Sequence, residues 1–165
     1  MLRLVHVLGG IFWVGSGPFT NLFLVPALAS TGPAAGQVSA ALQRRRLFVV
    51  LPVVALLTIA SGARLMWITS VGFSPAYLAS ASGRTFVAGA VAAIAAFVLS
   101  VAVVRPAAVR AARIGASSAA ATEAERVGLA AELARIQRRG AVFNLVVFAL
   151  LVLAAVSMAV GRYVH

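Results

Sequence analysis

Apolar residues dominate four stretches of the chain, and polar residues gather between them. The apolar runs cover roughly 4–28, 47–69, 85–105 and 141–161. Each is close to the 20 or so residues that an α-helix needs to cross a hydrocarbon core of about 30 Å. The pattern predicts an all-α integral membrane four-helix bundle, with residues 1–165 forming a single membrane domain.

The segment before the fourth run carries its own helix signal. Thr122 is followed three residues later by Glu125, which is the spacing of a capping box, and residues 122–140 are rich in helix formers. Glu132 also precedes Arg135 by one turn, a favourable helical pair. We therefore expect the fourth helix to continue beyond the membrane as a helical extension over 122–140.

Composition strengthens the membrane assignment and excludes several site types. Of the 165 residues, 62% are apolar and 10% are charged, whereas soluble domains carry about a quarter charged residues. The chain has no cysteine, which excludes disulfides and thiolate metal sites. The net charge of +11 does not indicate nucleic-acid binding, because the arginines lie between the apolar runs.

The arginines are distributed unevenly over the two sides of the predicted bundle. Arg3, Arg84 and Arg162 lie on one side, with Arg64 inside the second helix near that side. The other ten of the 14 basic residues occupy the two long connections. The positive-inside rule predicts that these connections are cytoplasmic and that both termini are outside, in a bacterial inner membrane. The ten are Arg44, Arg45, Arg46, Arg105, Arg110, Arg113, Arg126, Arg135, Arg138 and Arg139.

One face of the first apolar run carries unusual residues. His6, Gly10, Trp13 and Gly17 recur at spacings of four, three and four, so they share a helix face. Small residues allow close approach of another helix or of a flat ligand, and an ionisable residue within a membrane helix suggests a site. The face either binds a ligand at His6 or packs against other helices, and the pattern leaves both interpretations open.

Several further side chains lie at the predicted depth of His6 and suggest two chemistries. An axial histidine with Arg64 or Arg162 near the propionates would suit haem. A set of His6, Met158 and His165, with Met66 nearby, would suit Cu(I). The three acidic residues all lie in the extension, so no intramembrane carboxylate is present for acid–base catalysis or for a hard cation.

Three stretches carry a family resemblance. The first helix "LVHVLGGIFWVGSGPFTNLFLVPAL" places Trp13 seven residues after His6, followed by Gly15, Gly17 and Pro26. Together with "LQRRRLFVVLPVVALLTIASGARLMW" and the closing "AAVSMAVGRYVH", it resembles copper resistance protein D-like membrane proteins and HemJ-type protoporphyrinogen oxidases.

The two families imply different functions. The oxidase resemblance implies haem b with His6 as a ligand, and the copper resemblance implies copper uptake or tolerance. This chain lacks the lysine that the oxidases carry near the start of their second helix, which argues against porphyrinogen oxidation but leaves a haem site open.

We therefore expect a haem b-binding membrane protein of redox type, with the site between helices near the outer leaflet. A copper transport or tolerance protein is the second hypothesis. The third is a non-catalytic subunit of a larger membrane complex. The expected partner is the lipid bilayer, with a homo-oligomer or larger complex open and nucleic acid not expected.

Overall fold

The computed structural model describes residues 1–31, 35–118 and 120–164, and within these ranges the regular structure is helical, without strands. The first rod comprises α1 (Leu2–Pro18), the π-helical η1 (Phe19–Leu24) and α2 (Val25–Ser30). The second rod is α4 (Leu47–Thr69). The short helix α3 (Ala35–Arg44) precedes it, and α5 (Pro75–Ala79) follows it. The third rod is α6 (Ala81–Leu99), the π-helical η3 (Ser100–Val104) and α7 (Arg105–Ser117), and the fourth is α8 (Glu123–Val160) with the 3₁₀ turn η4 (Gly161–Tyr163).

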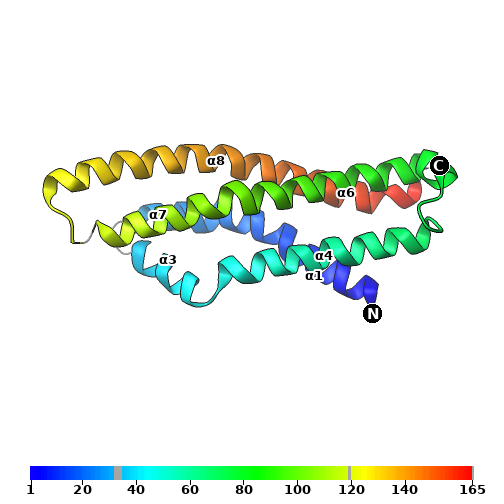
Figure 1. The fold of residues 1–165 in the computed structure, drawn as a ribbon, viewed down its shortest axis with the longest axis horizontal. Coiled ribbons are helices and arrows are strands. Elements are labelled where there is room, and N and C mark those ends of the chain that lie inside the picture. The colour runs from blue at the N-terminus through cyan, green and yellow to red at the C-terminus, as the bar shows by residue number, and fades with distance from the viewer. Residues whose placement is uncertain (32–34, 119, 165) are drawn as a thin grey trace.

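The four rods run alternately up and down in one elongated bundle (Figure 1). Both chain ends and the α4–α6 connection lie at one end, which we call the terminal end. The helices α3 and α7 and the start of α8 lie at the other, which we call the arginine-rich end. The most extensive packing joins α1 to α4 and α6 to α8. The structure thus consists of two closely packed helix pairs.

Four helices are long and apolar enough to cross a membrane: Leu2–Leu28, Leu47–Thr69, Ala81–Ser117 and Glu123–Tyr163. The four predicted apolar runs lie within them. Many large apolar side chains point outward, while the buried core is built around Trp13, Ala55, Ala96, Val147 and Leu151. Small buried residues let the helices approach closely, as expected for packing in lipid.

Two prolines are accommodated by π-helical segments. The Val25 N–H bonds to the carbonyl of Thr20 just before Pro26, and the Arg105 N–H bonds to that of Ser100 just before Pro106. A proline inside a helix lacks an N–H and crowds the carbonyl four residues back. A wider π turn before it relieves this conflict, so both rods continue through their prolines as helices.

The predicted capping box is confirmed, and residues 123–140 form a helix that is continuous with the fourth apolar run. The Thr122 N–H and hydroxyl both donate to the Glu125 carboxylate, at 2.8 and 2.7 Å. These hydrogen bonds hold the pKa of Glu125, outside the apolar segment, below its ordinary value. From there α8 continues without interruption through Gly140.

The third rod is longer than the predicted run 85–105, because α7 adds a helix to Ser117. Hydropathy ends the run at the arginines, whereas the alanine-rich segment after Arg105 keeps a high helix propensity. The helix α7 packs against the extension of α8, where Arg110 Nε donates to Glu132 at 2.8 Å.

The connection after α4 is a tight turn with three successive left-handed residues: Val71, Gly72 and Phe73. The Phe73 N–H donates to Ser70 Oγ at 2.8 Å, and the Phe73 ring meets Trp67 edge-on at 5.2 Å between centroids. Val71 has φ 52° although it is β-branched and 83% exposed. Its backbone is therefore strained without a compensating buried contact.

Candidate ligand site at His6

His6 lies half-buried between α1 and α4, and its ring is fixed by one hydrogen bond. The Nδ1 atom is 2.9 Å from the carbonyl oxygen of Thr58. A carbonyl oxygen can only accept, so the proton must be on Nδ1. In the neutral imidazole the lone pair then lies on Nε2, the state in which histidine ligates a metal.

Two glycines allow this approach of α1 and α4. A Cβ at Gly62 would lie 2.6 Å from His6 Cε1 and 3.0 Å from Nδ1, so any larger residue would displace the ring. A Cβ at Gly9 would overlap Thr58 Oγ1. Glycine at both positions brings the His6 ring against the backbone of α4, and the hydrogen bond follows from that proximity.

The polar residues of α4 that face His6 are satisfied within their own helix. Thr58 Oγ1 donates to Val54 O at 2.8 Å. Ser61 Oγ lies within hydrogen-bond distance of Leu57 O at 2.7 Å and of Thr58 O at 3.0 Å. Both side chains are buried. The Thr58 carbonyl can thus accept from Ser61 as well as from His6, which makes it a local anchor for the imidazole.

The predicted stripe on α1 faces the bundle, and its contacts are mainly helix packing. A Cβ at Gly10 would be 3.9 Å from Thr58 Cγ2, and one at Gly17 would be 3.7 Å from Phe148. Trp13 is 7% exposed and meets Phe97 edge-on at 6.4 Å. Trp13 belongs to the central core, two helical turns from His6, and its observed contacts are with that core.

The other predicted site residues are distributed over different surfaces. Met158 is half-buried in the α6–α8 interface, where its Cε would lie 3.4 Å from a Cβ at Gly89. Met66 is half-buried in α4. His6, by contrast, lies in the α1–α4 interface. Within the part of the chain that the structure describes, no three His, Asp or Glu side chains gather as a metal site. His165 lies outside the described residues.

Both predicted cationic residues are exposed. Arg64 follows Gly62 by two residues, about 200° around the helix, so it leaves α4 from another face than the one that contacts His6. The Arg162 guanidinium lies over the neighbouring Tyr163 ring, 4.6 Å from its centroid, and bonds its hydroxyl. The structure therefore does not bring either arginine against the imidazole.

Sequence reasoning missed the residues that position His6, namely Gly9, Thr58 and Gly62. A signal for them does exist. Thr58, Ser61 and Gly62 are small or polar residues at spacings of three and four within an otherwise apolar helix, so they share one face. The pattern marks a face that packs closely, but it does not say which helix covers that face.

No protein-family model, curated protein or solved structure matches this chain.

Proposed function

We propose that the protein is a haem b-binding integral membrane protein of redox type, in which His6 Nε2 would ligate the haem iron. The observation that supports this most directly is the hydrogen bond from Nδ1 to the Thr58 carbonyl. A bond of this kind fixes both the tautomer and the ring orientation of a ligating histidine, and it raises its basicity. When bound, haem b supplies one-electron redox chemistry, and the protein supplies the ligand and its orientation.

The charge distribution supports the same proposal. The three acidic residues of the chain, Glu123, Glu125 and Glu132, all lie at the arginine-rich end. The arginines of the terminal end therefore have no carboxylate side chain to pair with. Arg64 and Arg162 are exposed there. Neither faces the imidazole, so the part of the haem that they would meet is the propionates at its edge, which guanidinium binds bidentately.

We also propose how the bundle is oriented in the membrane and which membrane contains it. By the positive-inside rule the arginine-rich end faces the cytoplasm and both termini face outward, in a bacterial inner membrane. The resemblance to the HemJ-type oxidases and the copper resistance protein D-like proteins is consistent with a redox or metal role. The absence of lysine from the chain argues against porphyrinogen oxidation.

The alternatives receive less support from the geometry. Cu(I) would require convergent soft ligands, whereas His6 and Met158 lie in different helix interfaces. A subunit role based on the glycine face of α1 would need that face to be open. Gly9 and Gly10 instead approach α4 of the same chain.

The first test is the visible spectrum of the full-length protein purified in detergent, oxidised and then dithionite-reduced. We expect a Soret band and a sharp reduced α band, with a pyridine haemochrome spectrum of b-type haem. Metal analysis of the same sample should find iron and no stoichiometric copper. A colourless protein that carries copper would replace this proposal with the copper alternative, and a colourless, metal-free protein would refute both.

A further inference from the structure

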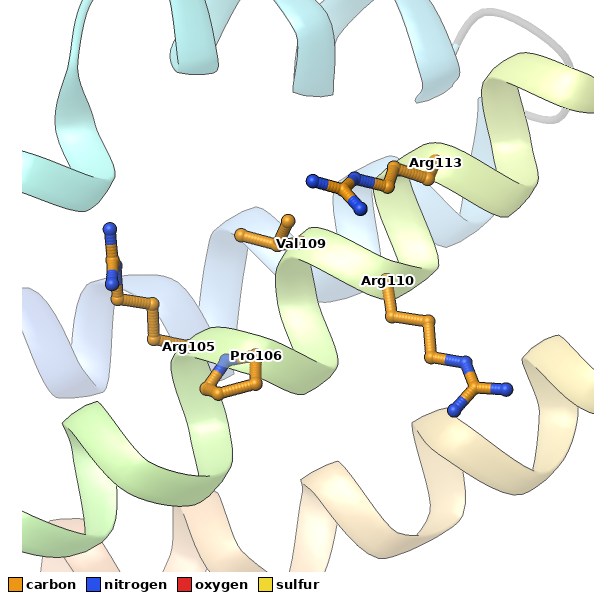
Figure 2. Close-up of a pocket in the computed structure, with 5 residues that line it drawn as sticks. All are labelled: Arg105, Pro106, Val109, Arg110 and Arg113. Carbon is orange, nitrogen blue, oxygen red and sulfur yellow. The ribbon is translucent and has the colours of Figure 1, made fainter.

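A second feature, at the other end of the bundle, is an open hollow of about 520 Å³ on α7. It is lined by three arginines and two apolar residues, namely Arg105, Arg110, Arg113, Pro106 and Val109 (Figure 2). All five come from one helix segment of nine residues. The hollow thus combines concentrated positive charge with an apolar floor.

The three arginines point in two directions. Arg110 extends toward α8, where its Nε bonds Glu132 at 2.8 Å. Arg105 and Arg113 extend on the side of α7 that faces α3 (Figure 2). Both are exposed. Two of the three guanidinium groups in the hollow are thus directed away from Glu132.

The protein has no carboxylate side chain left for these two arginines. Its three acidic residues are all engaged in the described structure: Glu132 with Arg110, Glu123 with Arg126 at 3.6 Å, and Glu125 with Thr122. Ten arginines against three glutamates leave this end strongly cationic. The counter-anions of Arg105 and Arg113 must therefore come from outside the chain.

The depth of the hollow indicates which anion is available. The residues directly before Arg105 are the apolar Val101, Ala102, Val103 and Val104, and they continue the apolar sequence of α6. The arginines thus begin where the membrane-spanning apolar segment ends. In a bilayer, that level is occupied by lipid phosphate groups, and basic pockets at this level bind anionic headgroups.

We propose that Arg105 and Arg113 form a binding site for the phosphate group of an anionic phospholipid, whose acyl region would lie along the apolar residues before Arg105. The proposal rests on insertion of the four helices in a membrane and is independent of the haem site at the terminal end. Guanidinium groups suit this ligand because they bind phosphate oxygens through two parallel hydrogen bonds.

The test uses the full-length protein in a neutral detergent, with native mass spectrometry to titrate phosphatidylglycerol and, separately, phosphatidylcholine. The double variant Arg105→Gln/Arg113→Gln should weaken phosphatidylglycerol binding about tenfold, the loss of two charge-assisted contacts. The control Arg138→Gln/Arg139→Gln removes the same charge from the same end of the bundle, outside the hollow, and should weaken binding about twofold or less. Circular dichroism and size-exclusion chromatography check that both variants fold.

A second variant tests whether binding depends on the bidentate geometry of the guanidinium groups or on their charge alone. Arg105→Lys/Arg113→Lys keeps both charges but loses the bidentate geometry, so we expect an intermediate affinity. If Arg105→Gln/Arg113→Gln and Arg138→Gln/Arg139→Gln weakened phosphatidylglycerol binding equally, the proposal would be overturned, because binding would then follow net charge alone. Equal binding of phosphatidylcholine would also overturn it. Displacement of phosphatidylglycerol by inorganic phosphate at comparable concentration would assign the site to a free anion instead of a lipid.

Discussion

Replacing Gly62 with alanine should displace the His6 ring and break the contact on which the site depends. A Cβ at this position would lie 2.6 Å from His6 Cε1, whereas carbon atoms pack at about 3.5–4.0 Å. The ring must therefore move by about 1 Å. The Nδ1 atom, now 2.9 Å from Thr58 O, would move out of hydrogen-bond range if the ring shifted directly away from α4.

The size of the effect can be worked from three contributions. Overpacking between two tightly packed helices costs about 1–3 kcal/mol. Loss of the His6 hydrogen bond adds about 1 kcal/mol. The higher helix propensity of alanine offsets about 1 kcal/mol of this destabilisation. We therefore expect Gly62→Ala to lower the free energy of unfolding by about 1–3 kcal/mol, and to weaken haem binding because the imidazole loses its orientation.

The assay is an unfolding titration in mixed detergent micelles, combined with the reduced α-band absorbance per protein. Gly15→Ala is the matched control, since it lies on the same rod as His6 and a Cβ there meets nothing within 4 Å. It should leave stability unchanged or raise it slightly. If Gly62→Ala were as stable as Gly15→Ala and kept its haem, the packing of His6 on Gly62 would be wrong.

Three further substitutions test other parts of the structure. Gly89→Ala would place a Cβ 2.9 Å from Ser157 Cβ. We expect it to lower the free energy of unfolding by about 1–3 kcal/mol in the same titration. An unchanged midpoint would contradict the α6–α8 packing. Val71→Asn replaces a β-branched residue in a left-handed conformation with one that tolerates it, so it should raise the free energy of unfolding by about 1 kcal/mol. A lowered melting temperature would show that the Val71 backbone is not strained. The Glu125 carboxylate has a lowered pKa, so its capping contribution is present above the ordinary pKa and lost as pH falls through the lowered one. The first turn of α8 should therefore exchange amide hydrogens faster at low pH after correction for intrinsic rates. This pH dependence should weaken in Thr122→Ala, which keeps only the backbone N–H hydrogen bond to Glu125.

The apolar pattern predicted the helices well because each of the four long helices contains a continuous apolar run of membrane-spanning length. The run 47–69 coincides with α4, and the capping box at Thr122 marks the start of α8. The same criterion missed α7, whose helix formers are alanine and arginine. Hydropathy reports where a membrane ends and does not report where a helix ends.

The candidate site was only partly predictable. Heptad spacing placed His6 and Trp13 on a bundle-facing stripe, and the structure agrees. The pattern could not identify Thr58 as the partner, because the relative depth of two helices depends on their packing and is not encoded in either periodicity. The prediction grouped Arg64 with His6 only because the two residues share a depth in the bundle. The position of Arg64 around the α4 axis turns its side chain away from His6.

Substituting the two histidines of the chain one at a time tests whether His6 ligates haem. His6→Ala and His165→Ala are expressed and purified in parallel with the wild type, and the dithionite-reduced minus oxidised spectrum is recorded per mole of folded protein. We expect the reduced α band to disappear in His6→Ala and to persist in His165→Ala. An unchanged α band in His6→Ala would contradict haem ligation by His6.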